Sequence, residues 1–323
     1  MTFHVVAPNP MLYRTLKVSR LWPGRVHEAA EADVTAAGRG IVAARALWAW
    51  GADTVLYSIA GGHGGRQLRG ELEMEGIPHV LTPVRGELGV VVRIVETQPP
   101  QRVTELHEPG PRISLAEQQA LVESVREALG EGDWLVLSGA LPPGASPALY
   151  LACMLEAQGR GCRVALDVPG EVLAALLKAS AKPVDVARVR GSDLGAASGL
   201  GPRVPSEGFA LLRQAGTVRE GLKRLQEAGV VYPVLSLGPA GAAIWVEGTV
   251  LRTRAPEVDN PNPAGCGDVF LAALLMALDE QGPRGALRVA TALAAEKAAR
   301  QDDLAPAWED AQKHLPQVRF EGL

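Results

Sequence analysis

The chain reads Asn262-Pro263-Ala264-Gly265-Cys266-Gly267-Asp268 immediately before an apolar helical segment at residues 269–276. Two glycines around one small residue let backbone N–H groups turn inward, and a helix start adds about half a positive charge, so this loop predicts a phosphate site. A carboxylate repels a nearby anion, so a carboxylate beside a phosphate site needs a chemical reason. Accepting the proton of a hydroxyl that attacks the phosphate is such a reason, which makes Asp268 a candidate base for phosphoryl transfer. The alternative interpretation is a helix cap that follows a simple glycine turn.

Length, composition and charge limit the class of protein. The chain has 323 residues and 47% hydrophobic content, enough for one large or two ordinary domains with a substantial core. Its net charge is −4 and no basic run stands out, which argues against a nucleic-acid partner. The N-terminus has no pattern of a secretory leader and no apolar run reaches about 18 residues, so we expect a cytoplasmic protein without a membrane partner.

The three cysteines, Cys153, Cys162 and Cys266, show no paired spacing with one another or with histidines. This spacing argues against both a disulfide framework and a zinc site. Cys266 leaves two interpretations open, because a helix N-terminus lowers the pKa of a thiol and a tight loop needs a small residue. The second interpretation, a small residue in a tight loop, is favoured.

Apolar β-rich runs alternate with helical patterns along the chain, which is typical of a mostly parallel sheet covered by helices. The pattern predicts one α/β domain over residues 1–323. Core strands are expected near 3–7, 53–60, 133–138, 163–167, 184–188 and 231–236. Helices are expected near 40–50, 64–75, 114–129, 146–160, 170–180, 207–228, 268–280 and 284–300.

Two regions, 12–36 and 79–107, break this alternation. They carry strand-like patterns, as at residues 89–96, with no long helix between their strands. We therefore expect a small β-layer attached to one edge of the main sheet. Such a layer has two uses, a lid over a substrate site or the surface of a homodimer. The segments 97–100 and 199–206 are expected to be loops.

Three further motifs follow predicted strands or open a predicted helix. The run 137–144 contains Ser138 and lies at the carboxyl end of a strand, where open α/β sheets bind their ligands. The run 236–241 also ends a strand, and its glycines would allow close packing against a ring or a phosphate. Arg39 lies in a small-residue loop that enters a helix, where a guanidinium suits a phosphate or a carboxylate. A solvent-exposed residue at a helix start is the alternative for Arg39.

Taken in order, the motifs resemble those of the PfkB or ribokinase-like family of ATP-dependent sugar kinases, and within it the 1-phosphofructokinase and tagatose-6-phosphate kinase branch. The resemblance covers nearly the whole chain. It includes Asn9-Pro10 with Arg14-Thr15-Leu16, residues 23–26, 38–41 with 44–47, 51–53, 75–78, 108–111, 137–144, 236–238 and 265–268.

This resemblance implies a central mixed sheet between helices with a β-lid, and ATP and Mg²⁺ as cofactors. It assigns Asp268 as the catalytic base, Gly265, Cys266 and Gly267 as the anion hole, and Ser236, Gly238 and Gly241 as the nucleotide wall. The acceptor, a sugar or sugar phosphate, is expected to contact Tyr13, Arg25, Gly38, Arg39 and Ser138. The resemblance assigns no metal ligands. Arg25 has a surface position on the lid as its alternative.

The acceptor side departs from the family pattern. Tyr13 stands where the family has an Asp that holds sugar hydroxyls, and Val42 replaces an Asn. Arg39 keeps the charge of the family's Lys but not its shape. The polar Thr-Arg-x-Asn run aligns with the apolar residues 88–91. The cation segment Lys-Pro-Asn-x-x-Glu aligns roughly with residues 187–192, and Asp193 would substitute for its Glu if the register slips by one residue.

These losses predict altered acceptor specificity, because each buried sugar hydroxyl left without its partner costs about 1–3 kcal/mol. Two explanations remain open: a kinase with a different acceptor, or a catalytically weak paralogue that binds nucleotide or sugar phosphate as a regulatory protein. The retained Asp268 and its loop favour the kinase. An oligomeric scaffold is a third alternative. A dinucleotide oxidoreductase is remote, since no Gly-x-Gly-x-x-Gly follows the first strand.

Overall fold

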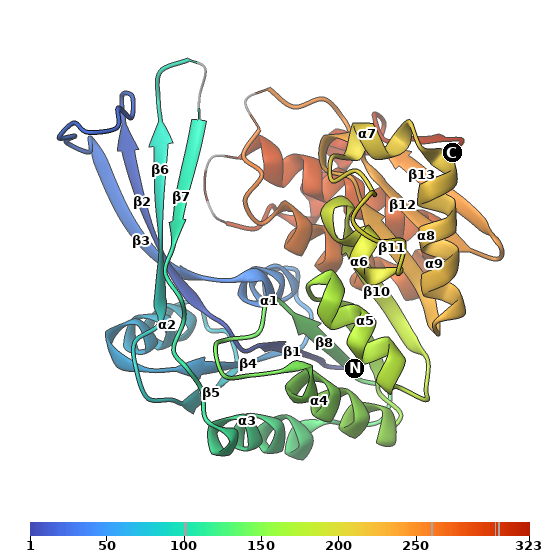
Figure 1. Ribbon diagram of the computed structural model, residues 1–323, viewed down its shortest axis with the longest axis horizontal. Coiled ribbons are helices and arrows are strands. Elements are labelled where there is room, and N and C mark those ends of the chain that lie inside the picture. The colour runs from blue at the N-terminus through green and yellow to red at the C-terminus, as the bar shows by residue number, and fades with distance from the viewer. Residues whose placement is uncertain (100–101, 260, 301, 303) are drawn as a thin grey trace.

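The main sheet runs through the middle of the molecule (Figure 1). The computed structural model describes residues 1–99, 102–259, 261–300, 302 and 304–323. Within these residues the sheet has the strand order β14-β13-β12-β11-β10-β9-β8-β1-β4-β5. Its strands are β1 (Phe3–Ala7), β4 (Thr54–Ala60), β5 (His79–Pro83), β8 (Trp134–Ser138), β9 (Arg163–Asp167), β10 (Val184–Arg190), β11 (Val230–Ser236), β12 (Ala242–Val246), β13 (Thr249–Arg254) and β14 (Arg319–Glu321).

The strands from β11 to β5 in this order pair in parallel, whereas β12, β13 and β14 form an antiparallel edge. Both β1 and β8 are buried along their whole length. Helices on both faces of a parallel sheet produce this uninterrupted burial, and it explains the continuous apolar runs in the sequence. The predicted α/β fold with a mostly parallel sheet is confirmed, and the antiparallel edge makes it the mixed sheet that the family resemblance implies.

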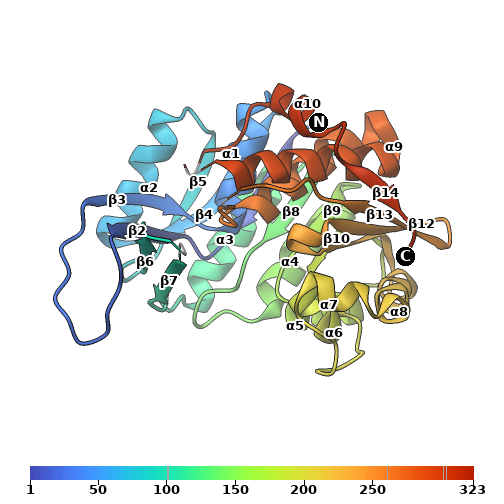
Figure 2. The same ribbon diagram turned by 90° about the horizontal axis from the view of Figure 1, so that it is seen from above.

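Helices cover both faces of the sheet, with α1, α9 and α10 on one face and α4, α5 and α8 on the other (Figure 2). A capping box formed by Ser114 and Glu117 fixes the start of α3, as this pair of side chains satisfies two free N–H groups. The helices are α1 (Arg39–Ala49), α2 (Gly62–Met74), α3 (Leu115–Ala128), α4 (Pro147–Gly159), α5 (Gly170–Ala179), α6 (Leu194–Ala197), α7 (Gly208–Leu212), α8 (Ala215–Glu227), α9 (Cys266–Ala299) and α10 (Ala311–His314), with 3-10 turns at Gly191–Asp193, Gly238–Ala240 and Trp308–Asp310.

A separate four-stranded sheet stands beside the main sheet (Figure 1). Its order is β3 (Glu31–Ala37), β2 (Met11–Val18), β6 (Gly89–Glu96) and β7 (Arg102–His107), and β2 pairs with β6 in parallel. This sheet is the predicted β-lid. Residues 100 and 101 of the predicted lid segment, and the end of the predicted loop 97–100, lie outside the described residues.

Two predicted elements were wrong in detail. Residues 79–83 form β5, which pairs with β4 in the main sheet and not with the lid. The single helix expected at 207–228 is interrupted at Gln214, whose ψ of 57° is not helical, so α7 and α8 are separate. The two helices expected at 268–280 and 284–300 are both present within α9, because Gly282, with φ of 64° and ψ of 176°, is not helical and separates them. Pro283 begins the second part, a position where its missing N–H leaves no helical hydrogen bond unmade.

The solvent-facing strand β7 is exposed along its length, including Val103 and Leu106. Exposed apolar side chains on an edge strand are consistent with a surface that pairs with another chain. A homodimer through the lid stays a prediction. No helix of the described residues is long and apolar enough to cross a lipid bilayer.

Candidate active site

The predicted site residues gather at one edge of the main sheet. The parallel strands β8, β9, β10 and β11 end there, and the registers place Ser138 beside Asp167 and Arg190 beside Ser236. Helix α1 begins near the same edge, because a side chain added at Gly40 would meet Cβ of Ser138 at 3.3 Å. The carboxyl edge of a parallel sheet is the usual ligand site in open α/β folds.

The glycine loop at the start of α9 has the geometry of an anion cradle. Gly265 adopts a left-handed conformation with φ of 72°, which favours glycine. Its carbonyl accepts hydrogen bonds from the N–H groups of Asp268 and Val269, at 3.1 and 3.0 Å. The N–H groups of Cys266 and Gly267 donate to no acceptor among the described residues. Free N–H groups at a helix N-terminus attract anions.

Asp268 lies in the first turn of α9 and is 8% exposed. Burial and, to a smaller extent, the neighbouring Asp167 carboxylate raise the pKa of its carboxyl to about 8, against the opposing effect of Arg188, Arg39 and Arg190. A carboxyl whose pKa lies near neutrality is suited to proton transfer at physiological pH. Strongly perturbed pKa values of this kind cluster at functional sites.

Arg188 is a site residue that the sequence interpretation missed. It is 5% exposed on β10 and donates to Asp167 on β9 at 2.9 Å and to the Ser236 hydroxyl on β11 at 3.1 Å. A side chain added at Gly267 would collide with its guanidinium. The Arg188 Nε has no hydrogen-bond partner among the described residues. A buried guanidinium therefore lies directly against the anion cradle.

In the structure, the segment that aligns with the family's cation motif takes part in an arginine–aspartate ion pair. Arg190, at the end of β10, pairs with Asp193 at 2.7 Å in the following 3-10 turn. Asp193 is the residue that would substitute for the family's Glu, and it already has a cationic partner. Asp167 likewise pairs with Arg188. Among the described residues, no group of three or more His, Cys, Asp or Glu side chains forms a metal-binding cluster.

Three buried polar atoms line the acceptor side without a partner among the described residues: Asn9 Oδ1, Arg39 Nη1 and Ser138 Oγ. Gly38 precedes α1 with φ of 149°, and a side chain there would lie 3.5 Å from the Asn9 carbonyl. Leaving a buried donor or acceptor unsatisfied costs about 1–3 kcal/mol. Such a group of atoms indicates a binding surface, and it contains the predicted residues Gly38, Arg39 and Ser138.

Tyr13 connects the lid to this surface. The Arg93 guanidinium lies 4.7 Å from the centre of the Tyr13 ring and donates to Glu105 at 2.9 Å. Burial raises the pKa of the Tyr13 hydroxyl, Glu105 and Asp268 raise it further, and Arg93 and Arg39 oppose them. These electrostatic contacts place Tyr13 near Asp268 and Arg39. Val91, which pairs with Tyr13 across β2 and β6, is fully buried.

Other predicted residues lie apart from this cluster or serve the fold. Arg25 is exposed on the loop between β2 and β3, which lies far from α9 in both views (Figures 1 and 2). Gly241 has φ of 99°, and a side chain there would collide with the Thr253 carbonyl, so β13 requires a glycine at this position. Gly238 is exposed to solvent. Arg25 is thus not brought to the site, whereas Ser236 is.

Cys266 does not have the properties of a reactive thiol. Burial raises its pKa to about 11, and the charges of Lys297 and Arg188 only partly oppose this rise. Its Sγ lies 3.2 Å from the Asn262 carbonyl. A thiol with a raised pKa is a poor nucleophile, so the small-residue interpretation of Cys266 is the better one.

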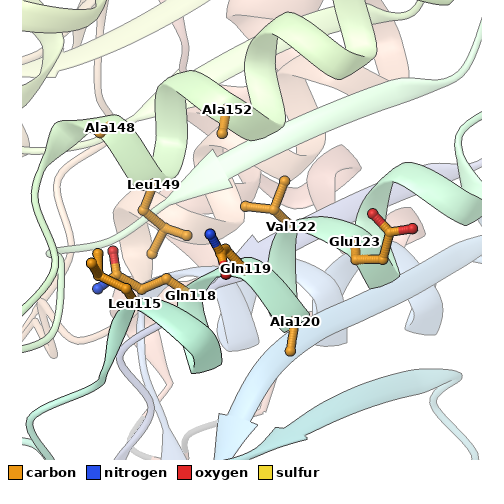
Figure 3. A pocket seen from close by; sticks show the side chains of 9 residues that line it. All are labelled: Leu115, Gln118, Gln119, Ala120, Val122, Glu123, Ala148, Leu149 and Ala152. Carbon is orange, nitrogen blue, oxygen red and sulfur yellow. The ribbon is translucent and has the colours of Figure 1, made fainter.

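A hollow of about 620 Å³ lies between α3 and α4 (Figure 3). Leu115, Val122 and Leu149 contribute apolar side chains to it, and Glu123 is its charged lining residue. It contains none of the predicted site residues. Volume alone therefore does not locate the chemistry, which depends on the convergence of buried charged groups around Asp268.

Comparison with known proteins agrees with this geometry, as residues 9–310 match the family described as pfkB family carbohydrate kinase. The chain belongs to this family. It is 29% identical over 275 residues to a 1-phosphofructokinase of Xanthomonas campestris pv. campestris, covering 84% of this chain and 83% of the relative. It is 30% identical over 273 residues to a 1-phosphofructokinase of Haloferax volcanii, covering 84% and 82%.

Solved structures share the fold over the whole length of this pfkB family chain. Phosphofructokinase-2 from Escherichia coli, in complex with potassium, superimposes with a TM-score of 0.86 at 22% identity and 98% coverage of both chains. Ribokinase from Thermotoga maritima gives a TM-score of 0.71 at 20% identity, with 98% and 99% coverage. The ribokinase-like fold and the resemblance noted in the sequence are confirmed.

Proposed function

We propose that this chain transfers a phosphoryl group from ATP to a hydroxyl of a sugar or sugar phosphate, with an acceptor specificity that differs from the common pattern of its branch. Family membership supports the general reaction, and curated relatives at about 30% identity are 1-phosphofructokinases. The observation that carries the proposal is the position of Asp268. Its carboxyl is buried beside a cradle of free N–H groups and has a pKa of about 8.

The chain's own residues divide the chemical tasks in this proposal. Asp268 accepts the proton of the attacking hydroxyl at a carboxylate oxygen. The N–H groups of Cys266 and Gly267, together with the adjacent Arg188 guanidinium, stabilise negative charge on the transferring group. Because these donors are fixed in place before the reaction, little reorganisation is needed. Ser236 holds Arg188 in position from β11.

The cofactors of this reaction are ATP, which supplies the phosphoryl group, and Mg²⁺, which neutralises phosphate charge. The unsatisfied donors of the α9 cradle fit a nucleotide's terminal phosphate. Mg²⁺ is usually held by one or two carboxylates together with substrate phosphates. Asp167 and Asp193 lie at this edge and would hold it, although each also pairs with an arginine.

The acceptor in this proposal is polar and carries an anionic group. Asn9 Oδ1, Arg39 Nη1 and Ser138 Oγ are buried and need partners, which an acceptor's hydroxyls and its phosphate or carboxylate supply. Val42 and Tyr13 stand where the family has hydroxyl-binding Asn and Asp. Fewer hydroxyl contacts and one aromatic contact favour an acceptor that is less polar or differently shaped than fructose 1-phosphate.

A coupled assay of ADP release tests the proposal with purified protein, MgATP and a panel of sugars, sugar phosphates and nucleosides. We expect ADP release that depends on at least one acceptor of the sugar or sugar-phosphate class. A thermal-shift screen of the same panel identifies ligands independently, since saturation at a hundred times Kd adds about 2.7 kcal/mol of stability. Acceptor-independent ATP hydrolysis alone would contradict the proposal.

The Arg190–Asp193 and Arg188–Asp167 ion pairs favour one second candidate, a regulatory paralogue that binds nucleotide or sugar phosphate without turnover. Both carboxylates suited to a metal ion are already paired with arginine. Calorimetry that shows MgATP binding, combined with no ADP release across the whole panel, would support this candidate over the kinase.

A further inference from the structure

Lys297 lies near the C-terminal end of α9, in the part that follows the break at Gly282, and its side chain lies behind the anion cradle at the start of α9. It is 1% exposed, among the most deeply buried of the large side chains described. A side chain added at Gly265 would lie 3.5 Å from Lys297 Cε. The stem of Lys297 therefore passes directly beneath the left-handed residue that shapes the cradle.

The ammonium of Lys297 is held in a fixed position. Its Nζ donates to the Asp302 carbonyl at 2.6 Å. Next to Lys297, the Ala298 carbonyl accepts from the Asn262 N–H at 2.8 Å, which ties the loop before the cradle to the end of α9. The Lys297 charge also acts on Cys266, the middle residue of the cradle, where it opposes the rise in the thiol's pKa.

A buried ammonium that lies against a backbone loop adds its charge to the positive potential of the loop's N–H groups. We propose that Lys297 is a positioning residue that supplies a fixed positive charge behind the Gly265–Gly267 loop and strengthens its attraction for a nucleotide's phosphate. In water such a charge would be screened, whereas in a buried position it acts over several ångströms. The proposal rests on the proposed nucleotide-binding function of the same loop.

The test measures MgATP binding by calorimetry without an acceptor, so that no turnover is required, for the wild-type protein, Lys297→Ala and Lys297→Arg. We expect Lys297→Ala to weaken binding by about tenfold to a hundredfold and Lys297→Arg to weaken it much less. Ammonium ions, which fit the space vacated in Lys297→Ala, should restore most of the lost affinity, and sodium at equal ionic strength should not. Wild-type binding should respond equally to the two salts.

Lys313→Ala is the matched control, because Lys313 is exposed on α10 and pairs with Glu296 and Asp310 on the surface. It should bind MgATP as the wild type does. If Lys297→Ala does not fold, as judged by circular dichroism, Lys297→Met preserves the apolar stem and takes its place.

The outcomes separate the two proposals. Wild-type protein that binds no MgATP would contradict the proposed function of the loop. Wild-type binding with equal affinity in Lys297→Ala or Lys297→Met would overturn the role of Lys297 alone. Weakened binding that ammonium does not restore, and that Lys297→Arg shares, would show that Lys297 only packs the loop, and would also overturn it.

Discussion

The two sides of the site are built from different parts of the chain. On the proposed nucleotide side, the Gly265–Gly267 cradle presents backbone N–H groups, and its shape depends on a left-handed glycine. On the proposed acceptor side, recognition would depend on side chains such as Tyr13, Arg39 and Ser138. A backbone site tolerates few substitutions, whereas a side-chain site can change its ligand with each one. Under the proposed function, this difference explains how the loop is retained while the acceptor residues depart from the family pattern.

Asp268→Asn gives the largest expected effect and tests whether Asp268 is the base between the nucleotide side and the acceptor side. Turnover should fall by about a hundredfold to ten-thousandfold, as for loss of a general base, while MgATP binding persists. The measurement is kcat by coupled ADP release, together with calorimetric binding of the nucleotide.

Stability provides the control for this substitution. The native pKa of Asp268 is raised from 3.8 to about 8, so between about pH 4 and 8 the native state holds a proton that the unfolded state releases. The contribution of Asp268 to the free energy of unfolding therefore declines as the pH rises through this range. The neutral Asn has no such decline. Asp268→Asn should therefore unfold at an equal or higher temperature than the wild type at pH 8–9. Unchanged turnover would remove Asp268 from the mechanism.

Gly267→Ala tests the nucleotide side alone. A new Cβ would collide with the Arg188 guanidinium, which cannot move freely because Asp167 and Ser236 hold it. Loss of this arrangement should lower kcat/KM for MgATP by about a hundredfold, comparable to removal of one oxyanion donor. Gly216→Ala on α8 is the matched control, since its Cβ meets open space, and it should retain wild-type kinetics. Equal kinetics in both variants would show that the cradle does not bind phosphate.

The shape of the loop before α9 could be predicted from the sequence because it has a local signature. Glycines around a small residue before an apolar helix specify a turn and a helix start, whatever the rest of the fold does. Arg188 was missed because it lies inside an otherwise apolar strand, and only the register with β9 and β11 shows that Asp167 and Ser236 are its neighbours. Lys297 was missed for a similar reason, since it lies near Gly265 only because the chain changes direction at Gly282, between the two parts of α9.

The boundary between sheet and lid shows another limit of local patterns. Residues 79–83 and 89–96 both alternate as strands do, but β5 pairs with β4 while β6 pairs with β2. Strand pairing depends on long-range contacts that alternation does not encode. Arg25 was predicted to contact the acceptor because its motif resembles the family's. Its loop, however, lies at the far end of the lid.

The pH dependence of turnover gives a smaller effect and tests the environment that both sides create around Asp268. With a pKa of about 8 in the free protein, the carboxylate fraction grows about tenfold from pH 7 to pH 9. We expect kcat/KM to rise by about that factor over this range. Arg39→Met removes a cation that lowers this pKa, so its profile should shift to higher pH. A flat profile between pH 6 and 9 would show that Asp268 is not the titrating base.

Val42→Asn gives the smallest expected effect and tests the acceptor side alone. Val42 lies against the cradle, with its Cγ1 3.1 Å from a side chain added at Gly265, so an amide there would face both the loop and the acceptor. One new hydrogen bond contributes about 0.5–1.5 kcal/mol, which corresponds to a gain of up to about tenfold in kcat/KM for a hydroxyl-rich acceptor such as fructose 1-phosphate. The KM for MgATP should remain unchanged. Val42→Leu offers no amide and controls for packing. If Val42→Leu produced the same gain in kcat/KM, the shape of the pocket and not a new hydrogen bond would determine which acceptor is used.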